Sequence, residues 1–406
     1  MSAITPVSTP LRKAIVAAVS TCLALAAALA LAAPADAGPR TFRPGIVNGT
    51  IPSEGELGAI RGIGARSVRV VFSWDVIEVR RRTGSSCATA LYNFDRHNEL
   101  VSRAGQRGIS ILPVLGDSPK YAGKIGARYP APGTRAFQDF QCFVRALVGH
   151  YGRGGAFPAR DIIEWQVWNE PNLPIYNPGK NVSPRKYGQL VKATAGSIRS
   201  QDSRATIVLA GLPEETKGGM NSNVFLRKMY RVNGIRGKFD AVALHPYARD
   251  ARGTKGALTR LRETLRDLGD RRRPVWVTEV GYGTDGPKGY FLVTTEKGQA
   301  DKLQSTLQML RQNRKRFKVG TFHWFDLRDQ ASYSENSRFW THYAGLYRKN
   351  GTPKPSCGRY KAFTGIGGRC APIQEGATSS SIAPDGGFTL GPEAAVDAGL
   401  VPSPPE

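Results

Sequence analysis

Several residue patterns that would indicate a bound metal ion or nucleotide are missing from this sequence of 406 residues. It has only five histidines and five cysteines, and none of them form a Cys-x-x-Cys or His-x-x-x-His spacing, which argues against a zinc site. No glycine-rich phosphate-binding loop follows the first expected strand, and no internal repeat is visible. We therefore expect a protein that uses neither a metal ion nor another cofactor.

Acidic side chains are also scarce. The sequence has 32 Asp and Glu against 57 Lys and Arg, which gives a formal net charge of +25. A field of this sign attracts polyanions, so acidic polysaccharides and cell-wall glycans are candidate partners. No basic helix with interleaved aromatic residues accompanies the charge, and nucleic acid is not an expected partner. An arginine-rich surface without any specific anionic partner is the alternative interpretation.

The first 37 residues have the pattern of a secretory signal peptide. Arg12 and Lys13 precede an uncharged run of mainly Ala, Leu and Val over residues 14–33, and Ala-Asp-Ala at 35–37 offers a cleavage site. We expect cleavage after this tripeptide, a secreted extracellular protein, and no stable membrane insertion afterwards. An uncleaved membrane anchor is the alternative, because the apolar run approaches spanning length. Cleavage would leave a net charge of about +24.

The rest of the chain divides into one domain and a tail. Residues 38–371 carry a regular alternation of apolar runs and are numerous enough to bury a large core as a single domain. Residues 372–406 are rich in Pro, Gly, Ala and Ser and contain few apolar side chains, so we expect a disordered tail. The tail lacks the apolar run that a membrane anchor needs. We expect the domain to be a monomer.

Four cysteines remain in the expected mature chain: Cys87, Cys142, Cys357 and Cys370. An even number in an exported protein predicts two disulfides, for which three connectivities are possible. We favour the bond between Cys357 and Cys370, because the loop between them is short and glycine-rich. Cys87 would then pair with Cys142.

Short, apolar, β-branched runs alternate with amphipathic helical patterns. The expected strands cover residues 42–47, 67–72, 109–114, 162–167, 205–209, 239–244, 274–278 and 319–323, and the expected helices cover 94–107, 136–150, 184–200, 258–268 and 300–316. This order predicts an α/β fold in which helices cover a parallel sheet. Eight units favour a closed (β/α)₈ TIM barrel, and an open doubly wound sheet is the alternative.

Polar and aromatic side chains gather directly after the expected strands, where a barrel of this kind carries its active site. Glu170 follows the fourth strand and Glu279 the seventh. Because these strands are three apart, the two carboxyl groups should face each other across the barrel mouth. Facing carboxylates suit the cleavage of glycosidic bonds. A single glutamate at a strand end is more often a solvated surface acid, so the prediction depends on the pair and its surroundings.

The segments around both glutamates resemble the glycoside hydrolases of clan A, and within that clan families 39 and 5. Residues 165–172 (WQVWNEPN) resemble the acid/base motif, and residues 276–281 (WVTEVG) resemble the strand that carries the nucleophile. His245-Pro246-Tyr247 matches a His-x-Tyr pattern after the sixth strand, Trp324 matches a tryptophan of the eighth strand, and Arg69 fits an arginine of the second strand. The resemblance covers nearly all of residues 42–365.

This resemblance implies a retaining glycosidase that acts on a polysaccharide or oligosaccharide, with Glu170 as the acid/base and Glu279 as the nucleophile. The residues that it implies for substrate binding and orientation are Arg69, Asn169, His245, Tyr247 and Trp324. The alternatives are a strand residue paired to a structural carboxylate for Arg69, a core histidine with satisfied hydrogen bonds for His245, and packing alone for Trp324. Two alternative functions remain open: a barrel that binds carbohydrate without catalysis, and a transglycosylase that uses the same residues.

Overall fold

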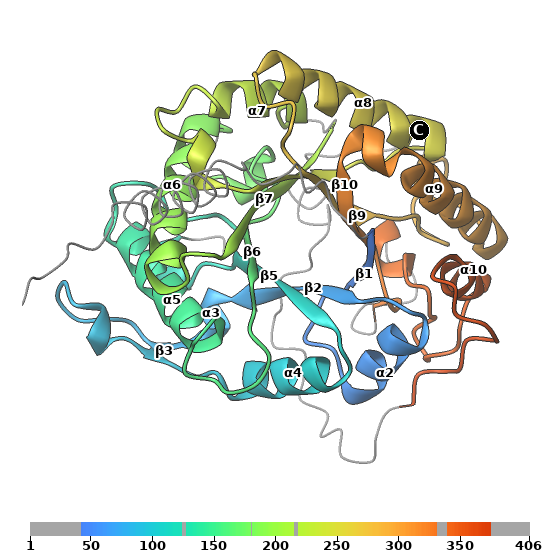
Figure 1. Cartoon of the computed structure of the whole chain (residues 1–406), viewed down its shortest axis with the longest axis horizontal. Helices are drawn as coiled ribbons and strands as arrows, with labels where there is room; N and C mark the ends of the chain where they lie inside the picture. Colours follow the sequence, from blue (N-terminus) through green and yellow to red (C-terminus); the bar gives the residue numbers. More distant parts are fainter. Residues whose placement is uncertain (1–41, 124–126, 180, 215–217, 331–338, 375–406) are drawn as a thin grey trace, which may run out of the picture. The chain divides into compact units, whose positions relative to one another are not determined.

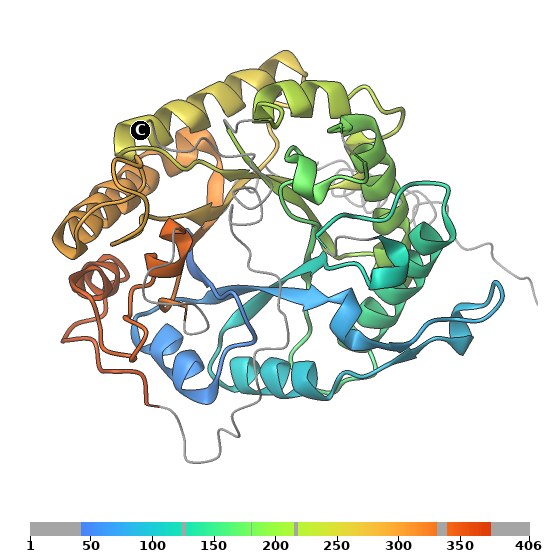
Figure 2. The same ribbon diagram turned by 180° about the vertical axis from the view of Figure 1, so that it is seen from behind.

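The computed structural model of the protein describes residues 42–123, 127–179, 181–214, 218–330 and 339–374. The expected signal peptide and almost all of the expected tail lie outside these residues. Within them, eight parallel strands form a closed barrel in the order β1-β2-β5-β6-β7-β8-β9-β10, and β10 pairs with β1. Helices surround the ring of strands (Figure 1; Figure 2 from behind). The predicted (β/α)₈ barrel is therefore confirmed.

The barrel strands are β1 (Arg43–Val47), β2 (Ser67–Ser73), β5 (Ser110–Gly116), β6 (Glu164–Val167), β7 (Thr206–Pro213), β8 (Ala241–His245), β9 (Val275–Val280) and β10 (Val319–Trp324). The helices of eight residues or more are α2 (Glu54–Gly62), α4 (Asp95–Gln106), α5 (Arg135–Tyr151), α6 (Pro184–Gln201), α7 (Ser222–Met229), α8 (Ala251–Asp267), α9 (Glu296–Phe317) and α10 (Pro355–Phe363). Each predicted strand overlaps one barrel strand, and each predicted helix overlaps one of these helices.

The start of α8 differs from the prediction, which placed it at residue 258. The helix begins at Ala251 because the side chain of Asp250 caps it, accepting a hydrogen bond from the N–H of Gly253 at 2.9 Å. Its first turns contain Gly253 and Gly256 and no regular apolar spacing, so periodicity alone does not reveal them.

Two layers of apolar side chains build the core. The larger layer lies between the strands and the surrounding helices, and it includes Trp165 of β6 and Leu258 of α8. A smaller cluster joins Leu112 of β5, Val208 of β7 and Trp276 of β9, which can meet only inside the barrel. Burial of both strand faces explains why the strands appear in the sequence as continuous apolar runs.

An insertion after β2 forms α3 (Trp74–Ile77) and a hairpin of β3 (Glu78–Arg80) and β4 (Leu91–Tyr92). The hairpin projects from the side of the barrel (Figure 1). A disulfide between Cys87 and Cys142 ties it to α5, with the two Cα atoms 5.3 Å apart. The buried Arg82 supports the same contact through a 2.5 Å ion pair with Asp139 of α5.

Both predicted disulfides are present, because Cys357 of α10 also pairs with Cys370, at a Cα separation of 6.3 Å. Disulfides of this kind are typical of proteins that leave the reducing cytosol. The described chain continues to residue 374, and Ile373 packs on the core while its N–H donates to the carbonyl of Gly351. None of the described helices combines the length and the apolar character required to cross a bilayer.

Candidate active site

The barrel brings the predicted site residues together from five of its strands and the turns that follow them. They lie on β2 (Arg69), directly after β6 (Asn169 and Glu170), at or just after the end of β8 (His245 and Tyr247), on β9 (Glu279) and at the end of β10 (Trp324). Hydrogen bonds and ion pairs join the first six of them into one network. Side chains that are far apart in sequence therefore form a single buried polar cluster.

Both carboxylate oxygens of Glu279 accept hydrogen bonds. The guanidinium of Arg69 donates to Oε1 at 2.6 Å, and the hydroxyl of Tyr247 donates to Oε2 at 2.6 Å. The side chains of Arg69 and Glu279 are both fully buried. Because both oxygens accept hydrogen bonds, one of them from a cation, the contacts suit an ionised carboxylate whose position is fixed.

Arg69 also binds two acceptors on the segment that begins with β6. Its Nε donates to Oε1 of Gln166 at 2.6 Å, and its Nη2 donates to Oδ1 of Asn169 at 2.9 Å. The planar guanidinium group therefore connects β2, β6 and β9 in one geometry. The Nδ2 group of Asn169 is buried and has no hydrogen-bond partner among the described residues, so it remains available as a donor.

Glu170 has the opposite electrostatic environment. Burial raises its pKa well above the ordinary value, the neighbouring Glu279 raises it further, and Arg69 lowers it in part. Its Oε1 is hydrogen-bonded to Nδ1 of His245 at 2.6 Å, whereas its Oε2 has no partner among the described residues. The carboxyl group is thus suited to carry a proton that it can transfer.

His245 orients this carboxyl group. Burial and the nearby Arg69 lower its pKa well below the ordinary value, which favours a neutral ring. Gln166 donates from Nε2 to Thr278 Oγ1 at 3.5 Å, and the Thr278 hydroxyl can then donate to Nε2 of His245, 3.0 Å away. In this arrangement Nδ1 of His245 carries the hydrogen and donates to Glu170, so Oε2 of Glu170 is the oxygen left to hold the transferable proton.

Space for the imidazole depends on a glycine in β7. A Cβ atom at Gly211 would lie 1.9 Å from Nε2 of His245 and 2.5 Å from Oγ1 of Thr278. A side chain at this position would displace the residue that holds Glu170.

The backbone after β6 is strained where it presents the acid. Trp168 and Glu170 have φ angles of 68° and 40°, in the left-handed region that non-glycine residues rarely adopt. Each such residue costs about 1–3 kcal/mol, and such strain concentrates at functional sites. The surroundings hold this turn, because Trp168 donates from Nε1 to the carbonyl of Ala127 at 3.0 Å and the Tyr187 hydroxyl donates to the carbonyl of Val167 at 2.9 Å.

Glu170, His245 and Glu279 also have the ligand types of a metal site, since one atom from each lies within 4.8 Å of the others. However, the guanidinium of Arg69 already neutralises Glu279, and Tyr247 occupies the second oxygen of that carboxylate. This donor set suits acid/base and nucleophilic chemistry better than the binding of a cation.

Comparison with solved structures shows the same barrel in several glycosidases. A glucosidase from Croceicoccus marinus matches with a TM-score of 0.60 and 16% identity over 80% of this chain and 67% of its own. The GH39 enzyme from Xanthomonas axonopodis pv. citri matches with a TM-score of 0.61 and 18% identity over 82% and 67%. A monomeric β-xylosidase from Caulobacter crescentus matches with a TM-score of 0.60 and 18% identity over 81% and 69%.

In sequence, residues 165–360 match the family described as the glycosyl hydrolase catalytic core. The matched region is therefore the catalytic core of a glycosyl hydrolase. No curated protein matches it in sequence. The matched region of this glycoside hydrolase begins on β6 and ends in α10, so it contains Glu170, Glu279 and every element between them.

The structure adds residues that the sequence analysis of this glycoside hydrolase left out. Gln166 and Thr278 form a hydrogen-bonded path from Arg69 to His245. Each is a polar residue within an apolar strand, and this is the sequence pattern that could have identified it. Trp340 packs its ring edge-on against Tyr247, with the ring centroids 5.2 Å apart. It follows no strand directly, so strand ends could not identify it.

Trp324 has a different environment from the other six predicted residues. It is fully buried at the end of β10, and its ring lies near that of Tyr282, with ring centroids 6.0 Å apart. No contact with the carboxylate network is recorded for it among the described residues. Its predicted role as a platform for a sugar ring remains a prediction.

Proposed function

We propose that this glycoside hydrolase is a secreted, retaining enzyme that cleaves an O-glycosidic bond of a polysaccharide or oligosaccharide by double displacement. Glu279 is the nucleophile and Glu170 is the acid/base. The observation that carries the proposal is the contrast between two carboxyl groups whose facing atoms lie within 4.8 Å. One accepts hydrogen bonds from Arg69 and Tyr247, and the other has a raised pKa and one oxygen without a described partner.

In the first step, Glu170 protonates the glycosidic oxygen while a carboxylate oxygen of Glu279 attacks the anomeric carbon. The bond to the leaving sugar breaks, and a glycosyl ester of Glu279 forms. Negative charge leaves Glu279 in this step, so the influence that raised the pKa of Glu170 weakens as Glu170 loses its proton. The loss of charge on Glu279 therefore favours proton release from Glu170 in the same step that requires it.

In the second step, the ionised Glu170 removes a proton from water, and the water oxygen attacks the anomeric carbon. The ester bond breaks, which restores the carboxylate of Glu279 and the protonated Glu170. Arg69 and Tyr247 then stabilise the departing carboxylate through the contacts that they make in the free enzyme. The two inversions give a product with the anomeric configuration of the substrate.

Asn169 is the proposed contact to the 2-hydroxyl of the sugar. Its Oδ1 accepts a hydrogen bond from Arg69, and its Nδ2, which has no partner among the described residues, is left as a donor of fixed orientation for the ligand. Hydrogen bonds to the 2-hydroxyl strengthen in the transition state of this chemistry. Trp324 is proposed to provide the apolar surface for the sugar ring.

Retention is supported by geometry. Carboxyl groups lie roughly 5–5.5 Å apart in retaining enzymes and about 6.5–9.5 Å apart in inverting ones, which need room for a water molecule. An upper limit of 4.8 Å between the facing atoms fits the first class. Secretion is supported by the two disulfides and by the expected signal peptide.

Proton NMR of the first-formed product tests the proposal. Purified enzyme is assayed on defined neutral and uronic polysaccharides, and the anomer that appears before mutarotation is recorded for each active substrate. We expect the anomeric configuration of the substrate. An inverted anomer would contradict the roles of Glu170 and Glu279, and a lack of turnover on every glycan would favour a carbohydrate-binding barrel.

A further inference from the structure

A pocket lies at the end of the barrel opposite to Glu170. It has a volume of about 200 Å³ and is formed at the first residues of the barrel strands β1, β5 and β6 and the residue before β2. Five aliphatic residues line it: Val101, Ile109, Ile111 and Ile162, which are at most 6% exposed, and Ile163, which is 38% exposed. Typical pockets for drug-sized ligands have about 300–1,000 Å³, so this one suits a single sugar ring or a smaller molecule.

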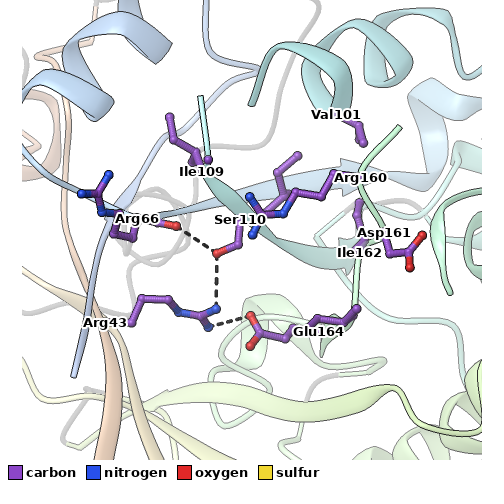
Figure 3. A pocket seen from close by; sticks show the side chains of 12 residues that line it. Arg43, Arg66, Val101, Ile109, Ser110, Arg160, Asp161, Ile162 and Glu164 are labelled. Atoms are coloured by element: carbon purple, nitrogen blue, oxygen red, sulfur yellow. Dashed lines mark hydrogen bonds and ion pairs between the residues drawn. The ribbon is translucent and has the colours of Figure 1, made fainter. Parts of the chain in front are cut away.

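Positive charge dominates the polar part of the pocket. Arg43, Arg66 and Arg160 line it together with only two acids, Asp161 and Glu164. Arg43 and Glu164 neutralise each other in a 2.6 Å ion pair. Asp161 points its carboxylate away from the other labelled polar groups, whereas Arg160 extends across the pocket toward Ser110 (Figure 3).

Two of these arginines have no partner in the described part of the chain. No hydrogen bond or ion pair is recorded there for the side chains of Arg66 and Arg160, and both residues are exposed. The buried Nε of Arg43 also has no partner among the described residues. A charged group usually gains a partner or stays fully solvated, so two unpaired guanidinium groups at a pocket form a ready site for an anion.

The apolar wall narrows the identity of that anion. Inorganic phosphate or sulfate would use the arginines but would make no apolar contact with Ile163, whose side chain is exposed at the pocket. A uronic acid unit combines a carboxylate with a sugar ring whose C–H groups pack on apolar surface. We propose that this pocket binds a uronic acid residue of an acidic glycan, at a site separate from the catalytic centre. The net charge of +25 would attract such a polymer over longer distances.

Methyl NMR on the Glu279→Gln variant tests this site without hydrolysis of the probe. The probe is digalacturonate, and its methyl ester and inorganic sulfate are the matched ligands. We expect digalacturonate to shift the methyl signals of Ile109, Ile162 and Ile163, and to leave Ile235, which does not line the pocket, unchanged. The ester should cause much smaller shifts, and raised salt should weaken binding because it screens the charges.

Charge reversal locates the site. Arg160→Glu should weaken digalacturonate binding at this pocket about tenfold or more, and Arg66→Glu should act in the same direction. Arg272→Glu is the matched control, because it makes the same charge change at an exposed position before β9, which lies outside the pocket. It should change the affinity by less than about twofold.

Several results would overturn the proposal. These are unmoved isoleucine signals, equal binding of the ester and the acid, binding of sulfate only, or an equal effect of Arg160→Glu and Arg272→Glu. None of them measures turnover, so each would leave the proposed glycosidase mechanism unaffected. Circular dichroism of each variant confirms that the loss of binding is not a loss of fold.

Discussion

Two arginine–glutamate pairs of the same length lie in this barrel, and their surroundings differ completely. Arg69 contacts Glu279 at 2.6 Å with both side chains fully buried, and Arg43 contacts Glu164 at 2.6 Å with side-chain exposures of 22% and 12%. The first pair lies in the catalytic network, and the second lies at the opposite end of the barrel, beside the arginine-lined pocket. Distance alone therefore does not reveal which pair serves catalysis.

The difference lies in desolvation and in the neighbouring donors. A fully buried ion pair loses the hydration of both groups, a cost that its mutual attraction often fails to recover. The Arg69 pair makes up for this with contacts to Gln166, Asn169 and Tyr247, which hold Glu279 in one orientation. Such an arrangement gives little net stability, and its value lies in a preorganised site. In the partly solvated Arg43 pair, Nη1 of Arg43 donates to Oγ of Ser110 at the longer distance of 3.3 Å.

The largest contrast between the two pairs should come from the glutamates. Glu279→Gln removes the nucleophile and should reduce turnover on every glycan by on the order of 10⁴–10⁶-fold. Glu164→Gln makes the same chemical change in the other pair, and its loss should be at least about a hundredfold smaller. The measurement is kcat on one substrate for both variants. Comparable losses of kcat in the two variants would show that the Arg69–Glu279 pair contributes no more to catalysis than the Arg43–Glu164 pair.

A smaller effect is expected for Glu170→Gln, and it should depend on the leaving group. Turnover of natural glycan should fall about 10²–10⁴-fold, because both proton transfers are lost. An aryl glycoside with an acidic phenol needs little protonation, so its first step should survive. Azide needs no general base and should restore turnover, giving a glycosyl azide with the anomeric configuration of the substrate.

The pH dependence of kcat/KM gives a control for Glu170→Gln. Burial raises the pKa of Glu170, and the protonated form is the active acid, so kcat/KM of the native enzyme should fall only as the pH rises past that raised pKa. Glu170→Gln should lack this alkaline limb on the aryl glycoside. Full activity of the variant on natural glycan, or azide rescue in Glu279→Gln with the same product, would reverse the assignment of roles.

The sequence predicts the fold well, because barrel strands that are buried on both faces give apolar runs with clear limits. It fails for the helices α2, α7 and α10, which have only eight or nine residues. Helices this short depend on tertiary contacts for their stability, so their pattern in the sequence is weak. In α2, three glycines weaken it further, and a capping box of Ser53 and Glu56 marks the start.

The sequence also indicates the two glutamates, because motifs and strand ends both identify them. It cannot supply the partner of each donor inside the barrel. That Arg69 binds Gln166 and Asn169 as well as Glu279 depends on strand register and rotamers across the interior. Trp340 follows a long segment after β10, and only folding brings it to Tyr247.

Tyr247→Phe should have an intermediate effect that distinguishes positioning from simple packing. The variant keeps the ring that contacts Trp340 and loses the hydrogen bond to Oε2 of Glu279. A hydrogen bond to a charged group contributes about 1.5–3 kcal/mol, which corresponds to roughly a 10–100-fold loss of kcat. KM should change little. Trp340→Phe is the comparison, and an unchanged kcat in Tyr247→Phe would exclude a role for the hydroxyl in holding the nucleophile.

The smallest effect should come from Arg43→Met at the opposite end of the barrel. Its pair with Glu164 is partly solvated, so the free energy of unfolding should fall by only about 1 kcal/mol. Arg69→Met is the matched change in the buried pair, and it leaves the carboxylate of Glu279 buried without a cation, at an expected cost of about 3–5 kcal/mol. Urea unfolding of both variants measures the difference, and Arg69→Met combined with Glu279→Gln should recover part of the larger loss because no buried charge remains. Equal losses of unfolding free energy in the two single variants would mean that the difference in burial does not change what each ion pair contributes to stability. A double variant no more stable than Arg69→Met would mean that the cost comes from lost packing rather than from an unpaired carboxylate.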